Sequence, residues 1–351
     1  MRLINRKFMI IRSSILRIGA KLMGVALLCV IVCSCMNKHD TGGSAYVAHP
    51  YIDAKNGYYT DGALYYDIQN NEGVVIGTSD KVREIVIPDY IGINEMQYPL
   101  TKVMNLGAFD KDTYETTQDV SDNDNLTTLV IGGNVKSFGQ DVLFRKVIYP
   151  NGQTDDNNMM RRYSNLENIY VKNGNALYDS RNNCNAIILT ANNELILGGK
   201  NTVVPAGVQK ISASAFRACK GLETISLPST LELIAPYAFS DSHLKTLDIP
   251  VNVVYIAHHA FNGCDSLVSL TLRSDIISIE SRAFTNCSSL KDPNSEVKFY
   301  SPNISVSSPE TVFDEGCNCL LVPEGQLSYF KGKGWEKCFL TIKEFEIKTN
   351  K

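Results

Sequence analysis

Four copies of one six-residue pattern decide the fold: Ile211-Ser212-Ala213-Ser214-Ala215-Phe216, Ile234-Ala235-Pro236-Tyr237-Ala238-Phe239, Ile256-Ala257-His258-His259-Ala260-Phe261 and Ile279-Glu280-Ser281-Arg282-Ala283-Phe284. The final phenylalanines are 23, 22 and 23 residues apart. Between them a second pattern, Leu222-x-x-Ile225-x-Leu227, recurs from Leu244 and again from Leu267. Self-similarity at a fixed period of about 20–50 residues is the signature of a repeat architecture.

Each copy predicts one coil of a solenoid. Ile225-Ser226-Leu227 alternates apolar and polar residues, which predicts a short strand with one buried face. Pro228 ends that strand because proline cannot donate to a sheet ladder. Residues 231–234 are expected to turn the chain, and Ala238-Phe239 to place a small and a large side chain inside. No copy can bury its apolar side alone, so successive coils must stack on one another.

We therefore predict a repeat solenoid of the α/β type that is mostly strand and turn. It is expected to be right-handed, with coils of about 22–23 residues and one parallel sheet face. Weaker copies at 85–87, 129–131 and 169–171 extend the solenoid over residues 81–345.

Three insertions interrupt the period of this solenoid. Residues 110–125 and 151–163 are rich in polar residues and are expected to be surface loops. Residues 185–199 place two apolar runs on either side of Asn192-Asn193, which predicts a hairpin.

Both ends of the solenoid require caps, because a terminal coil leaves one side of the core open. Residues 51–80 predict an N-terminal β cap, with a small hairpin formed by 64–68 and 73–76. After one more strand at 320–323, residues 324–345 predict a C-terminal cap. The apolar side chains expected to close the core there are Tyr329, Trp335, Phe339 and Ile342.

Residues 1–35 have the pattern of a targeting segment. Six basic residues precede a short apolar run, 22–32, which is too short to span a bilayer and suits a signal peptide. The following Val32-Cys33-Ser34-Cys35 resembles a bacterial lipobox, which implies lipidation of Cys35; a plain signal peptide is the alternative. Residues 36–50 then predict a flexible tether. We expect an exported protein that a lipid holds on a membrane without spanning it.

Several function classes find no support in the sequence. The net charge is -3 and basic residues cluster only at the N-terminus, so nucleic acid is not an expected partner. No Gly-x-Ser-x-Gly elbow, P-loop or His-Glu-x-x-His motif occurs, so we predict no enzyme, no catalytic residue and no cofactor. His258-His259 aligns with positions that vary between copies, which favours a solvated turn over a metal site.

The cysteines follow the repeat. Cysteine stands at the third position after the repeat phenylalanine in three copies and serine in the fourth: Cys219, Cys264, Cys287 and Ser242. This favours a small buried residue and reduced thiols, with a Cys264–Cys287 disulfide as the alternative. Cys317-Asn318-Cys319 lacks the spacing of a zinc knuckle. A disulfide from Cys317 or Cys319 to Cys338 stays open.

Two surfaces are candidates for binding. Solenoids commonly bind through their sheet face. Its expected outward residues are Tyr170, Thr224, Ser226, Thr246, Asp248, Ser269 and Thr271. The second surface consists of loop residues in the first half of the chain, namely Tyr58, Tyr59, Tyr114, Arg161, Arg162 and Tyr163.

With these motifs, the chain resembles the BspA-like leucine-rich repeat surface proteins of gut and oral Bacteroidetes. The resemblance covers roughly residues 58–345 and rests on the Ile-x-x-x-Ala-Phe units, the 216–222 linker, the 182–188 hairpin insertion and the 322–335 run. It implies a lipoprotein at the outer membrane or cell surface that binds or adheres to host or extracellular matrix proteins. The alternative is a glycan-binding accessory lipoprotein of an outer-membrane uptake system, with Tyr58 and Tyr59 as sugar platforms.

Overall fold

The computed structural model describes residues 45–54, 57–79, 82–107, 125–139, 142–148, 154–161, 163–273 and 277–347, with the backbone alone for 144–148 and 154–161. Contacts divide the chain into two units, 1–44 and 45–351, and every described residue belongs to the second. The predicted signal segment, Cys35 and most of the tether therefore lie outside the described residues. In this part of the chain, no helix has the length and apolar character that crossing a bilayer requires.

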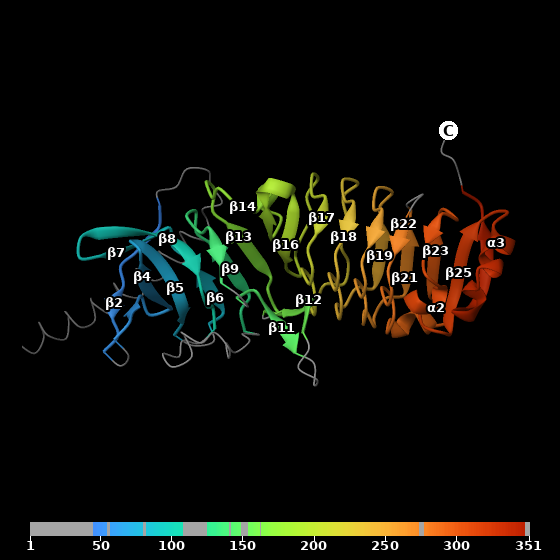
Figure 1. Ribbon diagram of the computed structural model, residues 1–351, viewed down its shortest axis with the longest axis horizontal. Coiled ribbons are helices and arrows are strands. Elements are labelled where there is room, and N and C mark those ends of the chain that lie inside the picture. Colours follow the sequence, from blue (N-terminus) through green and yellow to red (C-terminus); the bar gives the residue numbers. More distant parts are fainter. Residues whose placement is uncertain are drawn as a thin grey trace, which may run out of the picture. The chain divides into compact units, whose positions relative to one another are not determined.

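Two ladders of strands run through the repeats (Figure 1). The five-stranded sheet is parallel throughout, in the order β19 (Thr246–Ile249), β21 (Ser269–Leu272), β23 (Glu296–Phe299), β25 (Cys317–Pro323) and β26 (Phe339–Phe345). The eight-stranded sheet has the order β14 (Tyr178–Asp179), β15 (Ala186–Leu189), β16 (Glu194–Gly198), β17 (Lys210–Ile211), β18 (Leu233–Ile234), β20 (Tyr255–Ile256), β22 (Ile277–Ile279) and β24 (Ile304–Ser305). From β16 onward its pairs are parallel, and Lys210, Leu233, Tyr255, Ser278 and Ser305 share one row.

The second ladder corrects the prediction of a single parallel sheet. Residues 231–234 were expected as a turn, but Leu233–Ile234 forms β18 and pairs with the equivalent residues of both neighbouring coils. The two-residue strands are too short to show an alternating pattern in the sequence, although their isoleucines are buried.

A second correction concerns the strand predicted at Ile225–Leu227, which lies outside both ladders. The hydrogen bond from Lys245 N to Glu223 O (2.8 Å) joins this segment to the next coil. On its other side, residues 199–209 contain no strand that could pair with it. An apolar alternation becomes a strand only where a neighbouring backbone completes the ladder.

The first half of the described chain contains a parallel three-stranded sheet, β13 (Asn168–Val171), β9 (Thr128–Ile131) and β6 (Glu84–Val86). These are the strands that the weaker copies predict. A larger sheet precedes it, in the order β1 (Val47–Ala48), β7 (Tyr90–Ile93), β8 (Met96–Val103), β5 (Glu72–Thr78), β4 (Leu64–Gln69), β3 (Tyr59–Thr60) and β2 (Tyr51–Ile52), with β10 (Ser137–Phe138) beside β8.

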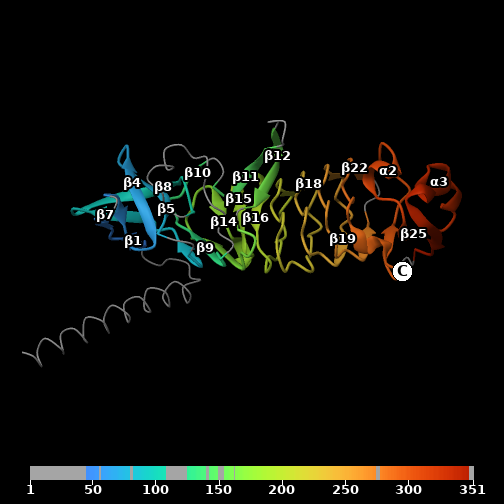
Figure 2. The same cartoon turned by 90° about the horizontal axis from the view of Figure 1, so that it is seen from below.

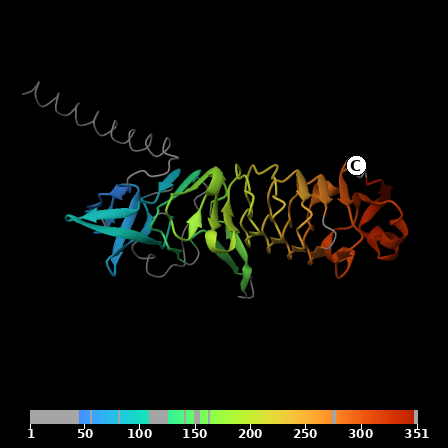
Figure 3. The same ribbon diagram turned by 90° about the horizontal axis from the view of Figure 1, so that it is seen from above.

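Hairpins account for much of this first half. The predicted hairpin over 64–76 is β4–β5, whose turn residues Asn70 and Asn71 both have positive φ. The β7–β8 hairpin was not predicted. Within the 151–163 insertion, expected to be a loop, β12 (Thr154–Arg161) pairs antiparallel with β11 (Phe144–Ile148). Figures 2 and 3 show this hairpin extending away from the coils.

Among the described residues, the helices are few and short, and they lie in connections and in the C-terminal region. They are α2 (Pro309–Val312), α3 (Leu327–Gly332), η1 (Arg181–Asn183), η2 (Thr190–Asn192), η3 (Ser288–Lys291) and η4 (Trp335–Lys337). At the C-terminal end Phe330, Trp335 and Phe339 are buried, as predicted for the latter two. Tyr329 is 43% exposed and does not close the core; its neighbour Phe330 occupies the interior instead.

The hairpin β15–β16 separates two hydrophobic cores. Ala186, Ile188 and Leu195 pack into the core of the repeats, which continues to the C-terminal cap. Ile187 and Leu197 pack into the core of the first half. Alternate residues of a strand face opposite sides, so a hairpin buried on both sides belongs to two cores at once.

A column of stacked phenylalanine rings runs through the core of the repeats: Phe216, Phe239, Phe261, Phe284 and Phe313. Adjacent ring centroids are 4.8, 5.0, 5.1 and 5.1 Å apart, and adjacent ring planes differ by no more than 9°. The backbone keeps this register, because the amides of Phe216, Phe239, Phe261 and Phe284 each donate to a carbonyl of the next coil; Phe216 N to Ala238 O and Phe239 N to Ala260 O are both 2.7 Å. We call these five residues the phenylalanine column.

A second column, of small side chains, runs beside the first. Cys264 Sγ donates to Phe239 O at 3.2 Å, and Cys287 Sγ to Phe261 O at 3.3 Å. Ser242 Oγ lies 3.4 Å from Cys264 Sγ. Cys264 and Cys287 therefore each link their coil to the carbonyl of the preceding repeat phenylalanine. All cysteines of the described residues are free thiols, Cys317, Cys319 and Cys338 included.

The end of the phenylalanine column generates a first prediction. A Cβ added to Gly198 would lie 2.1 Å from Cε1 and 2.3 Å from Cζ of Phe216, so the ring rests directly on this glycine. Gly198→Ala should lower the free energy of unfolding by about 1–3 kcal/mol, the usual cost of overpacking a core. Denaturant unfolding of the full-length protein measures this change.

The matched control is Gly332→Ala at the end of α3, where an added Cβ meets no atom within 4 Å. That substitution should leave stability unchanged or raise it slightly, because alanine loses less backbone entropy than glycine on folding. Equal effects of the two substitutions would contradict the packing of Phe216 on Gly198.

Thiol reactivity gives a second prediction. Burial raises the pKa of Cys264 to about 12 and that of Cys287 well above its usual value, so both are protonated at pH 8. Cys319 is only half-buried and should react first with iodoacetamide in the native protein. Peptide mass spectrometry after timed labelling measures the order. Labelling of Cys264 as fast as Cys319, or a disulfide at Cys264, Cys287 or Cys338, would contradict the structure.

Candidate binding face

The sheet face predicted from the sequence falls into separate parts. Tyr170 lies on β13, beside Val130 of the three-stranded sheet. Thr246 and Asp248 on β19 pair with Ser269 and Thr271 on β21, in the five-stranded sheet. Thr224 and Ser226 are exposed but lie in the segment without a strand between these sheets. The predicted residues therefore do not form one continuous row.

The outer face of the five-stranded sheet continues past the predicted residues. One row contains Asp248, Thr271, Lys298, Leu321 and Lys343, each paired with its neighbour on the next strand. On these strands the residues adjacent to the row point inward, and Leu270, Val297 and Leu320 are buried. Five successive strands thus present one outward side chain each at the same level.

At one edge of this face, charged and aromatic side chains come together. Arg273 Nε donates to Asp248 Oδ1 and Arg273 Nη2 to Asp248 Oδ2, both at 2.7 Å. The Arg273 guanidinium lies over the Tyr300 ring, 5.0 Å from its centroid. Lys298 Nζ lies 4.0 Å from the centroid of Phe345, whose ring meets Tyr300 edge-on at 5.2 Å. We call these five residues the aromatic–cation cluster.

The aromatic–cation cluster is partly accessible, with Lys298, Tyr300 and Phe345 half-buried, and its ion pair contributes little to folding. Asp248 and Arg273 keep 54% and 46% of their side-chain surface exposed, and ion pairs this exposed contribute about 0–1 kcal/mol. The hydrogen bonds to Asp248 raise the pKa of Arg273, so its positive charge is permanent. Arginine and tyrosine are enriched where proteins bind one another most strongly. Stacking on Tyr300 also holds the guanidinium in place before any partner arrives.

Sequence reasoning missed four residues of this cluster. The last repeat of the second ladder spans 27 residues, from Ser278 to Ser305, so the regular alignment ends before it. Phe299-Tyr300 stands where earlier copies have Leu227-Pro228, Ile249-Pro250 and Leu272-Arg273. Aligning the buried Phe299 with Leu272, its partner in the ladder, would have placed Lys298 on the outward face.

One residue of the predicted loop surface, Tyr163, lies in the core instead. Tyr163 is fully buried, and its hydroxyl donates to Val142 O at 2.8 Å in the core of the first half. Its polar neighbours in the sequence suggested exposure, but the aromatic ring is drawn inside. Tyr58 and Tyr59 are half-buried, with Tyr59 held in β3.

The side chains of the other three residues predicted for that surface are not among those that the structure describes. Tyr114 and Arg162 lie outside the described residues, and Arg161 ends β12, where only the backbone is described.

The histidine pair is more buried than the prediction of a solvated turn implied. His259 stacks on the buried Tyr237 with ring centroids 4.7 Å apart, and His258 N donates to Glu280 Oε2 at 2.8 Å. Both histidines are half-buried. Stacking of side chains at equivalent positions of neighbouring coils explains the difference. Across the described residues, no group of three His, Cys, Asp or Glu side chains is placed to hold a metal ion.

The family comparison agrees with the repeat motifs. Residues 198–305 match the family model described as "BspA type Leucine rich repeat region", in six copies. These residues are a BspA-type leucine-rich repeat region, as the resemblance predicted. The chain has the leucine-rich repeat fold, mostly strands with few helices and with parallel sheets. A search of curated proteins found no match.

Three solved structures are similar to this chain. The pneumococcal vaccine antigen PcpA is 14% identical, with 87% of this chain and 100% of that chain covered and a TM-score of 0.40. A leucine-rich cell surface protein from Faecalibacterium prausnitzii A2-165 is 14% identical, with coverage of 82% and 94% and a TM-score of 0.34. A leucine-rich repeat protein from Bacteroides ovatus ATCC 8483 is also 14% identical, with coverage of 80% and 66% and a TM-score of 0.33.

Proposed function

We propose that this protein binds a protein partner through the outer face of its five-stranded sheet. The observation that carries the proposal is the aromatic–cation cluster, in which Arg273 and Lys298 lie against Tyr300 and Phe345. A partner that offers a carboxylate beside a flat apolar surface fits this combination. The carboxylate would pair with the cations, and the apolar surface would cover the rings.

The scaffold supports a binding role because it holds these side chains rigidly. The cluster residues come from successive coils whose backbones are hydrogen-bonded to one another and whose interiors share one core. Binding to a preorganised surface loses little conformational entropy. Host-surface and extracellular matrix proteins are the partners we propose. We assign no catalytic residue, cofactor or metal to the chain.

We further propose that the protein is exported and held at the outer membrane or cell surface by a lipid on Cys35. The charged segment, the apolar run and the lipobox-like residues 32–35 support this proposal. In it, the tether is the part of residues 36–50 that precedes β1, because β1 pairs with β7, and residues 51–80 belong to the N-terminal cap. The solenoid that we propose over residues 81–345 is right-handed, and its regular coils, from Phe216 to Phe284, are about 22–23 residues long. The alternative, a glycan platform at Tyr58 and Tyr59, stays a prediction; both side chains are half-buried, as are those of Tyr300 and Phe345.

Binding measurements on the full-length protein test the role of the face. We expect saturable binding to at least one member of a panel of immobilised matrix and mucosal proteins, measured by surface plasmon resonance. Tyr300→Ala and Arg273→Ala should each weaken that binding about tenfold or more, because they remove the ring and the cation of the cluster. Circular dichroism should show unchanged folding for both variants.

Lys331→Ala is the matched control, because Lys331 is an exposed cation on α3, away from the sheet face. It should bind as the wild type does. Absence of saturable binding across the panel would contradict the proposal, as would wild-type affinity in Tyr300→Ala.

A further inference from the structure

The edge of the second ladder carries a hollow lined by polar residues and one glycine, none of which belongs to the binding face. Its volume is about 480 Å³, within the range of roughly 300–1,000 Å³ that small-molecule sites occupy. Its lining residues are Asn193, Gly207, Gln209, Ser229, Thr230, Glu232 and Asn252. We call this hollow the edge pocket.

Successive coils build the edge pocket from equivalent positions. Gln209 N donates to Asn193 O at 3.0 Å, and Glu232 N donates to Gln209 O at 2.9 Å. These three residues directly precede β16, β17 and β18, so their side chains follow one another at the spacing of the coils. The ladder therefore fixes the separation between the polar groups that line the pocket.

A second row closes the other side of the pocket. Gly207 N donates to Thr230 Oγ1 at 3.0 Å, and Thr230 Oγ1 donates to Val208 O at 2.8 Å. Asn252 Nδ2 donates to Ser229 O at 2.6 Å. Because its amide nitrogen is engaged there, Asn252 offers its Oδ1 as an acceptor.

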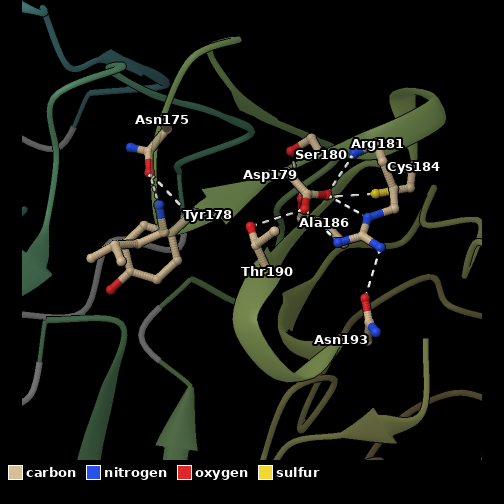
Figure 4. Close-up of polar contacts among 10 residues, drawn as sticks. Asn175, Tyr178, Asp179, Ser180, Arg181, Cys184, Ala186, Thr190 and Asn193 are labelled. Atoms are coloured by element: carbon tan, nitrogen blue, oxygen red, sulfur yellow. Dashed lines mark hydrogen bonds and ion pairs between the residues drawn. The ribbon is translucent and has the colours of Figure 1, made fainter. Parts of the chain in front are cut away.

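The hairpin insertion orients the amide at the far end of the pocket. Arg181 Nη1 donates to Asn193 Oδ1 at 2.9 Å, and Arg181 itself is held by Asp179 through two hydrogen bonds of 2.8 and 2.6 Å (Figure 4). With its oxygen occupied, Asn193 has its Nδ2 left to donate to a ligand. Among the described residues, the side chains of Gln209 and Glu232 have no hydrogen-bonding partner.

This set of groups selects a class of ligand. Asn193 supplies a donor, Asn252 and Glu232 supply acceptors, and Gln209 supplies both. A sugar hydroxyl can donate and accept hydrogen bonds at the same time, so a sugar can pair with all of these donors and acceptors. Glu232 is the one ionisable residue of the lining, and its negative charge disfavours an anionic ligand. A Ca²⁺ ion is disfavoured too, because Ca²⁺ sites use several carboxylates and this lining has one. No aromatic or aliphatic side chain lines the pocket to anchor a peptide.

We propose that the edge pocket binds a neutral saccharide unit through Asn193, Gln209, Glu232 and Asn252. Gln209, Glu232 and Asn252 are exposed, so the pocket accepts one unit of a longer glycan as readily as a free sugar. Without an aromatic ring for stacking, affinity for a single unit is weak. The site lies apart from the aromatic–cation cluster and does not depend on it.

Ligand-observed NMR on the full-length protein tests the site. The probes are the methyl glycosides of glucose, mannose and galactose, N-acetylglucosamine, and glucuronate as the anionic comparison. We expect saturable binding of at least one neutral sugar and at least tenfold weaker binding of glucuronate. Glu232→Ala and Asn193→Ala should each weaken the neutral sugar at least fivefold. Glu232→Gln should keep the neutral sugar and bring glucuronate to a similar affinity, because it removes the charge alone.

Glu223→Ala is the matched control: it removes an exposed carboxylate of the neighbouring segment that pairs with Lys245 at 2.8 Å, outside the edge pocket. It should leave sugar binding unchanged. Absence of saturable binding for every neutral sugar would overturn the proposal. Binding that Glu232→Ala leaves intact, or that Glu223→Ala weakens equally, would overturn it as well.

Discussion

The face-to-face packing of the phenylalanine column is the interaction on which the rest of the structure depends. Each ring between Phe216 and Phe313 lies between two others, with centroids about 5 Å apart, and none belongs to the core of a single coil. Removing a buried phenylalanine side chain costs about 3–5 kcal/mol. A coil by itself leaves both faces of its ring in water, so stability arises only from stacking.

This constraint determines where the chain is free to vary. The residue two positions before each repeat phenylalanine has a positive φ, as in Tyr237, His259 and Arg282. The backbone of this turn is therefore the same in each coil, while the side chain differs. Outward positions of the strands are free in the same way. The aromatic–cation cluster occupies such positions where the coils lengthen near the C-terminal cap. The edge pocket is instead lined by residues of the connections that precede the strands of the second ladder, beside the β15–β16 hairpin. Both candidate sites therefore lie where the regular coils meet an irregular neighbour.

The features predictable from the sequence are those that recur in it. The repeat phenylalanines, the small residue at Cys264 and Cys287, and the strand at 246–249 follow a fixed period, and the strands at 129–131 and 169–171 repeat its apolar pattern; the structure contains each of them. What could not be predicted depends on contacts between coils. Ile225–Leu227 has the pattern of a strand but lacks a partner on one side. The second ladder consists largely of two-residue strands, too short to leave a pattern.

The candidate site was predictable only in part, for the same reason. Asp248 and Thr271 were identified because they follow the repeat, whereas the contacts of Asp248 with Arg273 and of Arg273 with Tyr300 join residues 25 and 27 positions apart. Tyr163 shows the opposite error, since polar neighbours in the sequence concealed a buried aromatic ring.

Native-state hydrogen exchange tests most directly whether the phenylalanine column unites the coils. The amides of Phe216, Phe239 and Phe261, each bonded to the next coil, should exchange with similar opening free energies in the wild type. Phe261→Ala should lower all three together by about 3–5 kcal/mol. An effect confined to the amide of residue 261, with Phe216 and Phe239 protected as before, would contradict the account.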